Sequence, residues 1–148
     1  MLKPFTVVPE NRPEPLNIVG EGITILASKD KTHGYEVFLQ EGPEGSGPPP
    51  HSHHWDETFI VTKGNVEFGY GEKKMVATTG TLVHLPAGTV HWFHFKEEGG
   101  QMISITGHTG DASGFFTDLA RAIPSGVPDI DKIQDVAKRH GIKFQPGE

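Results

Sequence analysis

Cysteine is absent from this chain of 148 residues. Its absence excludes disulfide bonds, thiolate metal sites and cysteine nucleophiles. Basic residues are also few, because 13 lysines and arginines stand against 19 acidic residues and give a formal net charge of −6. This balance argues against nucleic acid and against an anionic membrane as partners of the protein.

A long apolar run is missing as well. The first residues, MLKPFTVVPENRPEP, hold no stretch long enough for a signal peptide or a membrane span. We therefore expect a cytoplasmic protein, and the repeated prolines predict an extended arm over residues 1–20. Arginine occurs only at Arg12, Arg121 and Arg139, so an anionic substrate has no evident clamp near the motifs described below.

Glycine and proline, by contrast, are abundant, with 19 and 12 copies, and they favour short strands joined by turns. Such runs follow one another between residues 22 and 107: ITILAS, YEVFLQ, ETFIVT, NVEFGY, KMVATT, TLVHLP, VHWFHF and QMISIT. Lys63-Gly64 predicts a hairpin turn between ETFIVT and NVEFGY, and EEGG predicts a break between VHWFHF and QMISIT. The pattern is typical of an all-β sandwich or barrel, and no linker divides residues 1–148 into separate domains.

After residue 107 the spacing of apolar residues becomes helical. One side of a predicted helix would carry an apolar stripe of four residues: Phe115, Phe116, Leu119 and Ile123. A second helix is predicted to begin at an N-cap, Asp129, and to end near Gly141. We expect one or two short helices within residues 111–141. They either cover an open end or edge of the barrel or form a mobile lid over a site.

The densest chemical pattern is PPPHSHHWDE, residues 48–57. Side chains at positions i and i+2 of a strand point to the same face, so His51 and His53 converge if this segment is extended. The preceding prolines favour that extension and stiffen it. Glu57 keeps the same parity if the strand resumes after Asp56, whereas His54 is expected to point away.

A further ligand would come from the segment GTLVHLPAGTVHWFHF, which supplies His84, His91 and His94. Parity alone does not choose between His91 and His94, although the PAG turn places His91 at the start of a new strand. Three imidazoles and one carboxylate would suit Fe(II), Mn(II), Ni(II), Co(II), Cu(II) or Zn(II) and would disfavour Ca(II) and Mg(II). A histidine-rich strand can also be no more than a solvated face.

The spacing of these residues resembles the two cupin motifs. The first motif is matched by Gly45, His51, His53, Glu57 and Gly64. The second, 15 residues further on, is matched by Gly80, Pro86, Gly88 and His91, with Phe95 where the family usually has Asn. The resemblance implies a small cupin β-barrel, an antiparallel double-sheet jelly roll. It also implies that His51, His53, Glu57 and His91 ligate one divalent transition metal, and that the chain forms a homodimer.

The run GPPPHSHHWDETFIVTKG is also similar to that of single-domain cupins described as quercetin-dioxygenase-like. This resemblance implies an oxygenase for a small aromatic or enol-type substrate, with Glu57 as a ligand that also accepts the substrate's proton. Two alternatives remain: a non-redox metal-dependent isomerase or lyase, and a non-catalytic cupin that binds a small molecule. Several apolar residues are predicted to point to the same side of their strands as the ligands. They form either a substrate pocket or plain barrel core: Phe59, Val61, Phe93, Phe95 and, as a neighbour, Met102.

Overall fold

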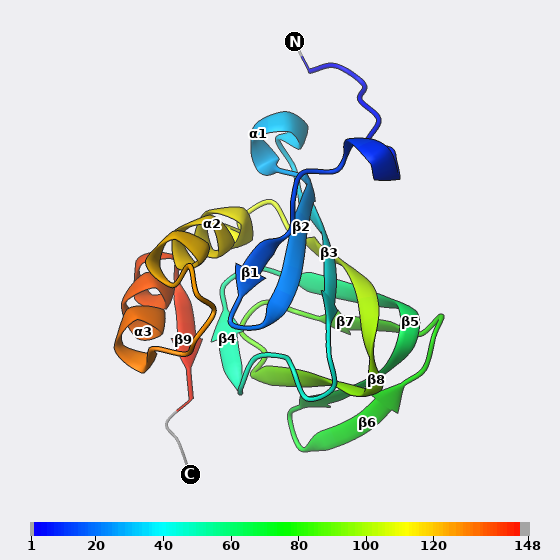
Figure 1. Ribbon diagram of the computed structural model, residues 1–148, viewed down its shortest axis with the longest axis vertical. Coiled ribbons are helices and arrows are strands. Elements are labelled where there is room, and N and C mark those ends of the chain that lie inside the picture. The colour runs from blue at the N-terminus through cyan, green and yellow to red at the C-terminus, as the bar shows by residue number, and fades with distance from the viewer. Residues whose placement is uncertain (1, 146–148) are drawn as a thin grey trace.

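The computed structural model describes residues 2–145, and their strands form one antiparallel sheet that curls into a barrel (Figure 1). The strands are β1 (Leu16–Ile18), β2 (Glu21–Ala27), β3 (Glu36–Gly42), β4 (His51–His53), β5 (Glu57–Tyr70), β6 (Lys73–Ala77), β7 (Leu82–Leu85), β8 (His91–Thr106) and β9 (Ile142–Phe144). The helices are a 3-10 turn, η1 (Pro9–Asn11), and α1 (Lys29–Thr32), α2 (Ala112–Ala122) and α3 (Ile130–Arg139). The predicted all-β barrel with short C-terminal helices is confirmed.

Two long strands, β5 and β8, connect the two halves of the barrel. Residues 100–106 of β8 lie between β3 and the first part of β5. Residues 91–95 of β8 pair with the second part of β5 on one side and, at His91, with β4 on the other. Each long strand therefore runs through both halves of the curled sheet, which is how the antiparallel jelly roll closes.

The predicted hairpin at Lys63-Gly64 and the predicted break at EEGG are both wrong. In the structure each segment is a bend within a continuous strand, because Lys63 pairs with Gln101 and Gly64 pairs with Gly100. Gly64 has a φ of 70° and Gly99 a φ of 74°. Left-handed glycines of this kind turn the corner of a barrel without reversing the chain. The two bends lie opposite each other, so both strands pass from one half of the curled sheet to the other at the same level.

A methyl group at the β5 bend is expected to destabilise the barrel. In Gly64→Ala the residue would keep a positive φ, and its Cβ would overlap the carbonyl oxygen of Gly99. The backbone strain and the overlap together should cost about 2 kcal/mol or more. Gly71→Ala is the matched control, because Gly71 also has a positive φ, 58°, but no atom lies within 4 Å of the added Cβ. Thermal unfolding should therefore show a larger loss for Gly64→Ala, and equal losses would contradict the bend geometry.

The N-terminal arm is less extended than predicted. Residues 9–11 form the 3-10 turn, and β1, inside the predicted arm, pairs with β2, so the sheet begins at Leu16 rather than at residue 22.

Among residues 2–145 no helix is long and apolar enough to cross a membrane.

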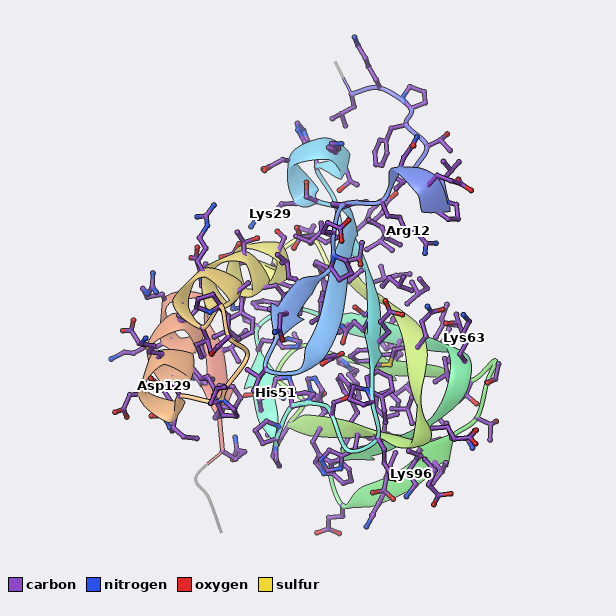
Figure 2. All side chains as sticks on the ribbon, viewed as in Figure 1. Arg12, Lys29, His51, Lys63, Lys96 and Asp129 are labelled. Atoms are coloured by element: carbon purple, nitrogen blue, oxygen red, sulfur yellow. The ribbon has the colours of Figure 1, made fainter. Side chains whose placement is uncertain are left out.

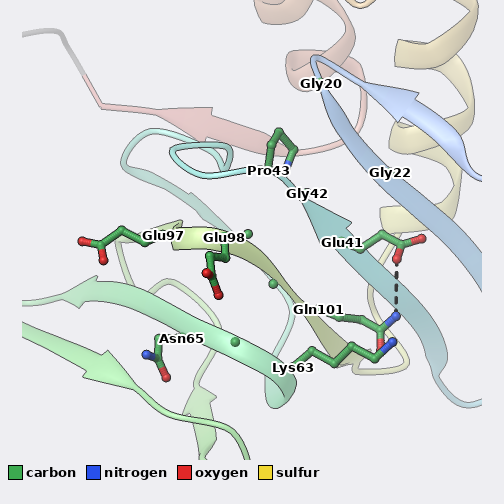
Figure 3. Close-up of a pocket in the computed structure, with 13 residues that line it drawn as sticks. Gly20, Gly22, Glu41, Gly42, Pro43, Lys63, Asn65, Glu97, Glu98 and Gln101 are labelled. Atoms are coloured by element: carbon green, nitrogen blue, oxygen red, sulfur yellow. Dashed lines mark hydrogen bonds between the residues drawn. The ribbon is translucent and has the colours of Figure 1, made fainter.

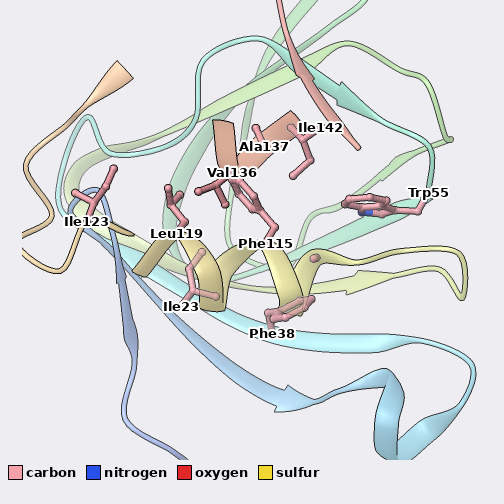
Figure 4. Packing of buried hydrophobic residues seen from close by; sticks show 10 residues of the cluster. Ile23, Phe38, Trp55, Phe115, Leu119, Ile123, Val136, Ala137 and Ile142 are labelled. Atoms are coloured by element: carbon pink, nitrogen blue, oxygen red, sulfur yellow. The ribbon is translucent and has the colours of Figure 1, made fainter. Parts of the chain in front are cut away.

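Helices α2 and α3 cover one end of the barrel through a shared apolar core. Figure 4 shows Phe115 and Leu119 of α2 and Val136 of α3 packed against Ile23 and Phe38 of the sheet. The side chain of Asp129 accepts a hydrogen bond from the backbone of Lys132, so the predicted N-cap of α3 is confirmed. A shared buried core is what a fixed cover requires, and the structure favours that interpretation of the helices.

The sequence pattern did not predict β9, which follows α3 directly. After Gly141, whose φ is 77°, the chain pairs antiparallel with β4. His51 lies opposite Phe144 and His53 lies opposite Ile142. The C-terminal segment therefore protects the edge of the short strand that carries two of the predicted ligands.

A charged network anchors the helices to each other. The imidazole of His140, at the end of α3, donates one N–H to Asp111 and the other to Asp118, both on the α2 side of the contact. Lys29 donates to the second oxygen of Asp111 at 3.0 Å. Burial alone would lower the pKa of His140, but the two carboxylates outweigh it and raise the pKa. The same contacts lower the pKa of Asp111, again against the effect of its partial burial.

This network predicts a pH-dependent stability. Because the pKa of His140 is raised, its stabilisation is complete below the unfolded value near 6.5 and is lost as the pH rises through the folded value. The contribution of Asp111 is lost when the pH falls below about 3.8, through its lowered pKa. The free energy of unfolding, measured by thermal unfolding, should be higher for wild type than for His140→Gln by about 1 kcal/mol or less near pH 5.5. The difference should be smaller at pH 8.5. A gap that widens with pH would contradict the network.

Candidate metal centre

Three buried histidines from two strands converge inside the barrel. His51 and His53 lie on the inner face of β4, and His91, the first residue of β8, pairs directly with His51. One ring nitrogen from each of the three lies within 4.8 Å of the other two. The structure thus resolves the choice that parity left open: His91 faces the cluster, whereas His94 and His54 are exposed. Figure 2 shows His51 near the centre of the molecule, with the labelled charged residues around its periphery.

The same nitrogen of each ring is already used by a hydrogen bond. Each Nδ1 lies 2.9 Å from a backbone carbonyl oxygen, which accepts and does not donate. The carbonyl of Pro49 accepts from His51, that of Trp55 from His53, and that of Thr89 from His91. The Nδ1 atoms must therefore carry the protons, which leaves the lone pair on Nε2 free. A fixed tautomer with a free Nε2 is the usual state of a metal-ligating histidine.

Local sequence explains how the rings are held. The proline run supplies the carbonyl of Pro49 to His51, and the next carbonyl, of Pro50, accepts from the backbone N–H of Gln145 after β9. The PAG turn before His91 is fastened to the first motif, because Gly88 donates its N–H to the carbonyl of His53 at 2.8 Å. The carboxylate of Asp56 accepts from the N–H of Ala87 at 2.8 Å. These contacts fix the position of the second motif relative to the first.

Glu57 places a buried carboxylate beside two of the three rings, although only the three histidines form the convergent cluster. Its Oε1 lies 3.1 Å from Nε2 of His53 and 3.7 Å from Nε2 of His91. Burial alone would raise the pKa of Glu57, but hydrogen bonds from His53 and His91, when these rings are protonated at Nε2, outweigh it and lower the pKa to about 2. Because Nδ1 of His53 already holds a proton, its Nε2 would turn a lone pair toward a carboxylate oxygen. A proton or a cation between them is required, and three nitrogens with one oxygen are a donor set that transition metals accept.

His51 is available as a ligand without competition from protons. Burial, and secondarily the neighbouring imidazole of His91, lower the pKa of His51 to about 3. The ring is therefore neutral at every physiological pH. Since only neutral imidazole ligates a metal, the free energy of metal binding includes no cost for deprotonating His51.

Comparison with known proteins agrees with this geometry. A family model described as a cupin domain matches residues 38–106, which include both motifs. An 83-residue segment is 28% identical to quercetin 2,3-dioxygenase of Bacillus subtilis (strain 168) and covers 55% of this chain. Residues 38–106 thus match a cupin domain. This cupin spans about a quarter of the length of that dioxygenase, because the match covers 25% of it.

Solved structures show the same fold at lower sequence identity. This cupin superposes on KdgF from a Halomonas species with a TM-score of 0.68 and 18% identity, covering 75% of this chain and 99% of KdgF. It also superposes on the polyketide cyclase RemF from Streptomyces resistomycificus with a TM-score of 0.60 and 14% identity, covering 73% and 80% of the two chains. Identities this low establish a common fold and nothing about the reaction.

The residues predicted to line a substrate pocket are packed against one another in the barrel of this cupin. They belong to one buried cluster that contains Phe59, Val61, Phe93, Phe95 and Met102. The Phe93 ring lies 5.5 Å from that of Phe59 and 5.8 Å from that of Phe95. These contacts are what a barrel core requires. That the same residues contact a substrate stays a prediction.

A groove of about 650 Å³ lies away from the histidines, at the corner where β5 and β8 bend (Figure 3). Its wall includes Glu41, Lys63 and Gln101, which share the outer face of the sheet, and Glu41 accepts a hydrogen bond from Gln101 at 3.3 Å. The groove is therefore on the outside of the barrel and does not lead to the metal centre. His84 is also outside, exposed and hydrogen-bonded to Thr58.

The sequence pattern did not reveal two buried residues near the three histidines. The indole of Trp55 stacks on the ring of His53, with centroids 4.3 Å apart and planes at 8°, and so fixes the orientation of that ligand. Glu21 of β2 is a second buried carboxyl, and burial together with repulsion from the charge of Glu57 raises its pKa. The sequence does hint at Glu21, because this acid directly follows the Val19-Gly20 turn and lies on the same face of the strand as the buried Ile23. An acid at such a position is out of keeping with a simple apolar strand.

Proposed function

We propose that this cupin is a metal-dependent oxygenase for a small aromatic or enol-type substrate. His51, His53, His91 and Glu57 would hold one divalent transition metal: Fe, Mn, Ni, Co, Cu or Zn. The observation that carries the proposal is the convergence of ring nitrogens from three buried histidines whose Nδ1 atoms are all hydrogen-bonded to backbone carbonyls. The partial similarity to quercetin 2,3-dioxygenase supports the choice of an oxygenase.

When bound, such a metal supplies a Lewis acid toward a substrate hydroxyl and, if it is redox-active, chemistry with dioxygen. The residues of the chain supply the rest. Glu57 is ionised at neutral pH, and its Oε1 is turned toward His53 and His91. Its other oxygen is therefore the atom to accept a proton from a substrate hydroxyl. The packed aromatic rings beneath the centre, including Phe59, exclude water from that side.

Oxygen transfer under controlled atmosphere tests this function. The purified protein, loaded in turn with each of the six metals, would be mixed with quercetin without oxygen and then exposed to air. The oxygenase consumes dioxygen in proportion to the substrate lost and is inactive before exposure. Turnover at the same rate without oxygen would contradict an oxygenase.

A second candidate is a non-redox isomerase or lyase that uses the same centre. A site of three nitrogens and one oxygen also suits Zn(II), and the fold is shared with a polyketide cyclase. This alternative predicts turnover that is independent of oxygen and persists with Zn(II). A non-catalytic binding protein would instead show stabilisation by the ligand in thermal unfolding and no product.

A further inference from the structure

Among the described residues, two buried glutamates other than Glu57 differ in one respect. Glu36 on β3 is satisfied: its two oxygens accept hydrogen bonds from the backbone N–H groups of Lys29 and Ser113, both at 3.1 Å. Glu21 on β2 is 5% exposed, and its Oε1 is buried without a hydrogen-bond partner among the described residues. A buried, unpartnered carboxyl oxygen is costly for the folded state and therefore needs an explanation.

A strained turn fixes the direction of Glu21. Residues Val19 and Gly20 connect β1 to β2 with φ values of 52° and 93°. Positive φ is a rare conformation for a β-branched residue such as Val19, and it persists only where the surroundings enforce it. The turn is held by Asn17, whose Oδ1 accepts from the N–H of Gly20 at 3.0 Å. Glu21 is thus the first residue of β2, on the same inner face as Ile23.

Glu21 lies within electrostatic range of Glu57, beside the three histidines. The negative charge of Glu57 acts on Glu21 and, after burial, is the second cause that raises the pKa of Glu21 to about 8. Two other buried polar atoms beside the centre also lack a partner in the described chain: Oγ1 of Thr106, opposite Glu57 in the register, and Nε1 of Trp55, whose ring covers His53. Unpartnered acceptors and donors therefore surround the cluster, although the barrel core below it is apolar.

We propose that Glu21 is a substrate-binding residue, whose carboxyl group forms a hydrogen bond with a polar group of the substrate other than the one at the metal. This inference rests on the proposed function and specifies its substrate: a polyoxygenated molecule with at least one further hydroxyl or carbonyl group. A purely apolar aromatic ring would leave Glu21 as unsatisfied as it is in the free protein. Retention of a destabilising side chain at a binding site is the expected trade-off between stability and function.

The first test compares Glu21→Leu with the matched Glu36→Leu in the full chain without ligand. Leucine has a similar volume and removes the unsatisfied oxygen, so Glu21→Leu should raise Tm by about 2 °C or more. Glu36→Leu should lower Tm, because it leaves two backbone N–H groups unpaired. A fall in Tm for Glu21→Leu as well would show a structural carboxyl and overturn the proposal.

Metal content separates a substrate-binding residue from a ligand. Glu21→Leu and Glu21→Gln should retain the wild-type ratio of metal to protein in elemental analysis. Loss of metal in both variants would make Glu21 part of the metal centre and overturn the proposal.

The third test measures binding of quercetin and of 3-hydroxyflavone, which share the chelating hydroxyl and keto groups, whereas quercetin carries further hydroxyls. Wild type should prefer quercetin, and Glu21→Leu should lose about tenfold or more of that preference with unchanged affinity for 3-hydroxyflavone. An unchanged preference would overturn the proposal. If neither flavonol binds wild type, the flavonol form of the proposed function fails, and Tm and metal content alone decide on Glu21.

Discussion

His91→Ala is expected to lower the affinity for a divalent transition metal by at least about 100-fold, more than the loss of an outer hydrogen-bond partner of a ligand causes. The reason is geometric: a ring nitrogen of His91 is one of three that converge, and its Nε2 is buried without a hydrogen-bond partner in the described chain. His51→Ala should have the same effect, because the two residues face each other across β4 and β8. Titration with Co(II) or Ni(II), followed by the absorption spectrum, measures these affinities.

His54→Ala is the matched control, since His54 is adjacent in sequence to a predicted ligand and yet exposed. Its Nε2 contacts the carbonyl of Thr109 on the outside of the loop. Metal affinity should stay within about threefold of wild type, the scatter expected of a surface substitution. Equal losses for His51→Ala and His54→Ala would show that metal binds to the histidine-rich segment as a whole and not at the convergent site.

Glu57→Gln is expected to retain metal in part and to lose turnover. The amide keeps the shape of the carboxyl group and one oxygen donor, but it cannot accept a proton. Loss of a general base typically lowers the rate by about 100-fold to 10,000-fold. We therefore expect single-turnover rates with quercetin to fall by a factor in that range, while metal affinity falls by much less. The rates and the metal content should be measured on the same preparations.

Glu41→Gln is the matched control for Glu57→Gln, because Glu41 lies on the outer face of β3, away from the centre. It should change neither metal content nor turnover. Intact turnover in Glu57→Gln would show that Glu57 is not the base. Complete loss of metal would reduce its role to that of a ligand.

Much of the fold could be predicted from residue alternation, but the corners of the barrel could not. A glycine with positive φ is required both where a chain reverses and where it bends, so Lys63-Gly64 was compatible with either. The chain bends there, rather than reversing, because Gly64 pairs with Gly100 of β8, a residue distant in sequence. β9 was missed for a similar reason, because its three residues become a strand only through pairing with β4.

At the candidate centre, local geometry predicted two of the candidate ligands, and the tertiary structure places a third histidine beside them. The i, i+2 spacing places His51 and His53 on one face without any further information. Choosing His91 over His94 required the register between β4 and β8, which the resemblance implied and the structure shows. Glu21 could not be found in this way, because its burial depends on where the β1–β2 hairpin packs. The homodimer, the cytoplasmic location and the substrate pocket stay predictions.

The metal centre is tested most directly by anomalous diffraction from crystals of the protein loaded with Co(II) or Ni(II). Data collected above and below the absorption edge of the metal locate the ion independently of its ligands. The account predicts one peak per chain, bonded at about 2.0 to 2.2 Å to Nε2 of His51, His53 and His91 and to an oxygen of Glu57. A peak at Nδ1 of these rings, at an exposed histidine such as His54, or nowhere in the barrel would contradict it.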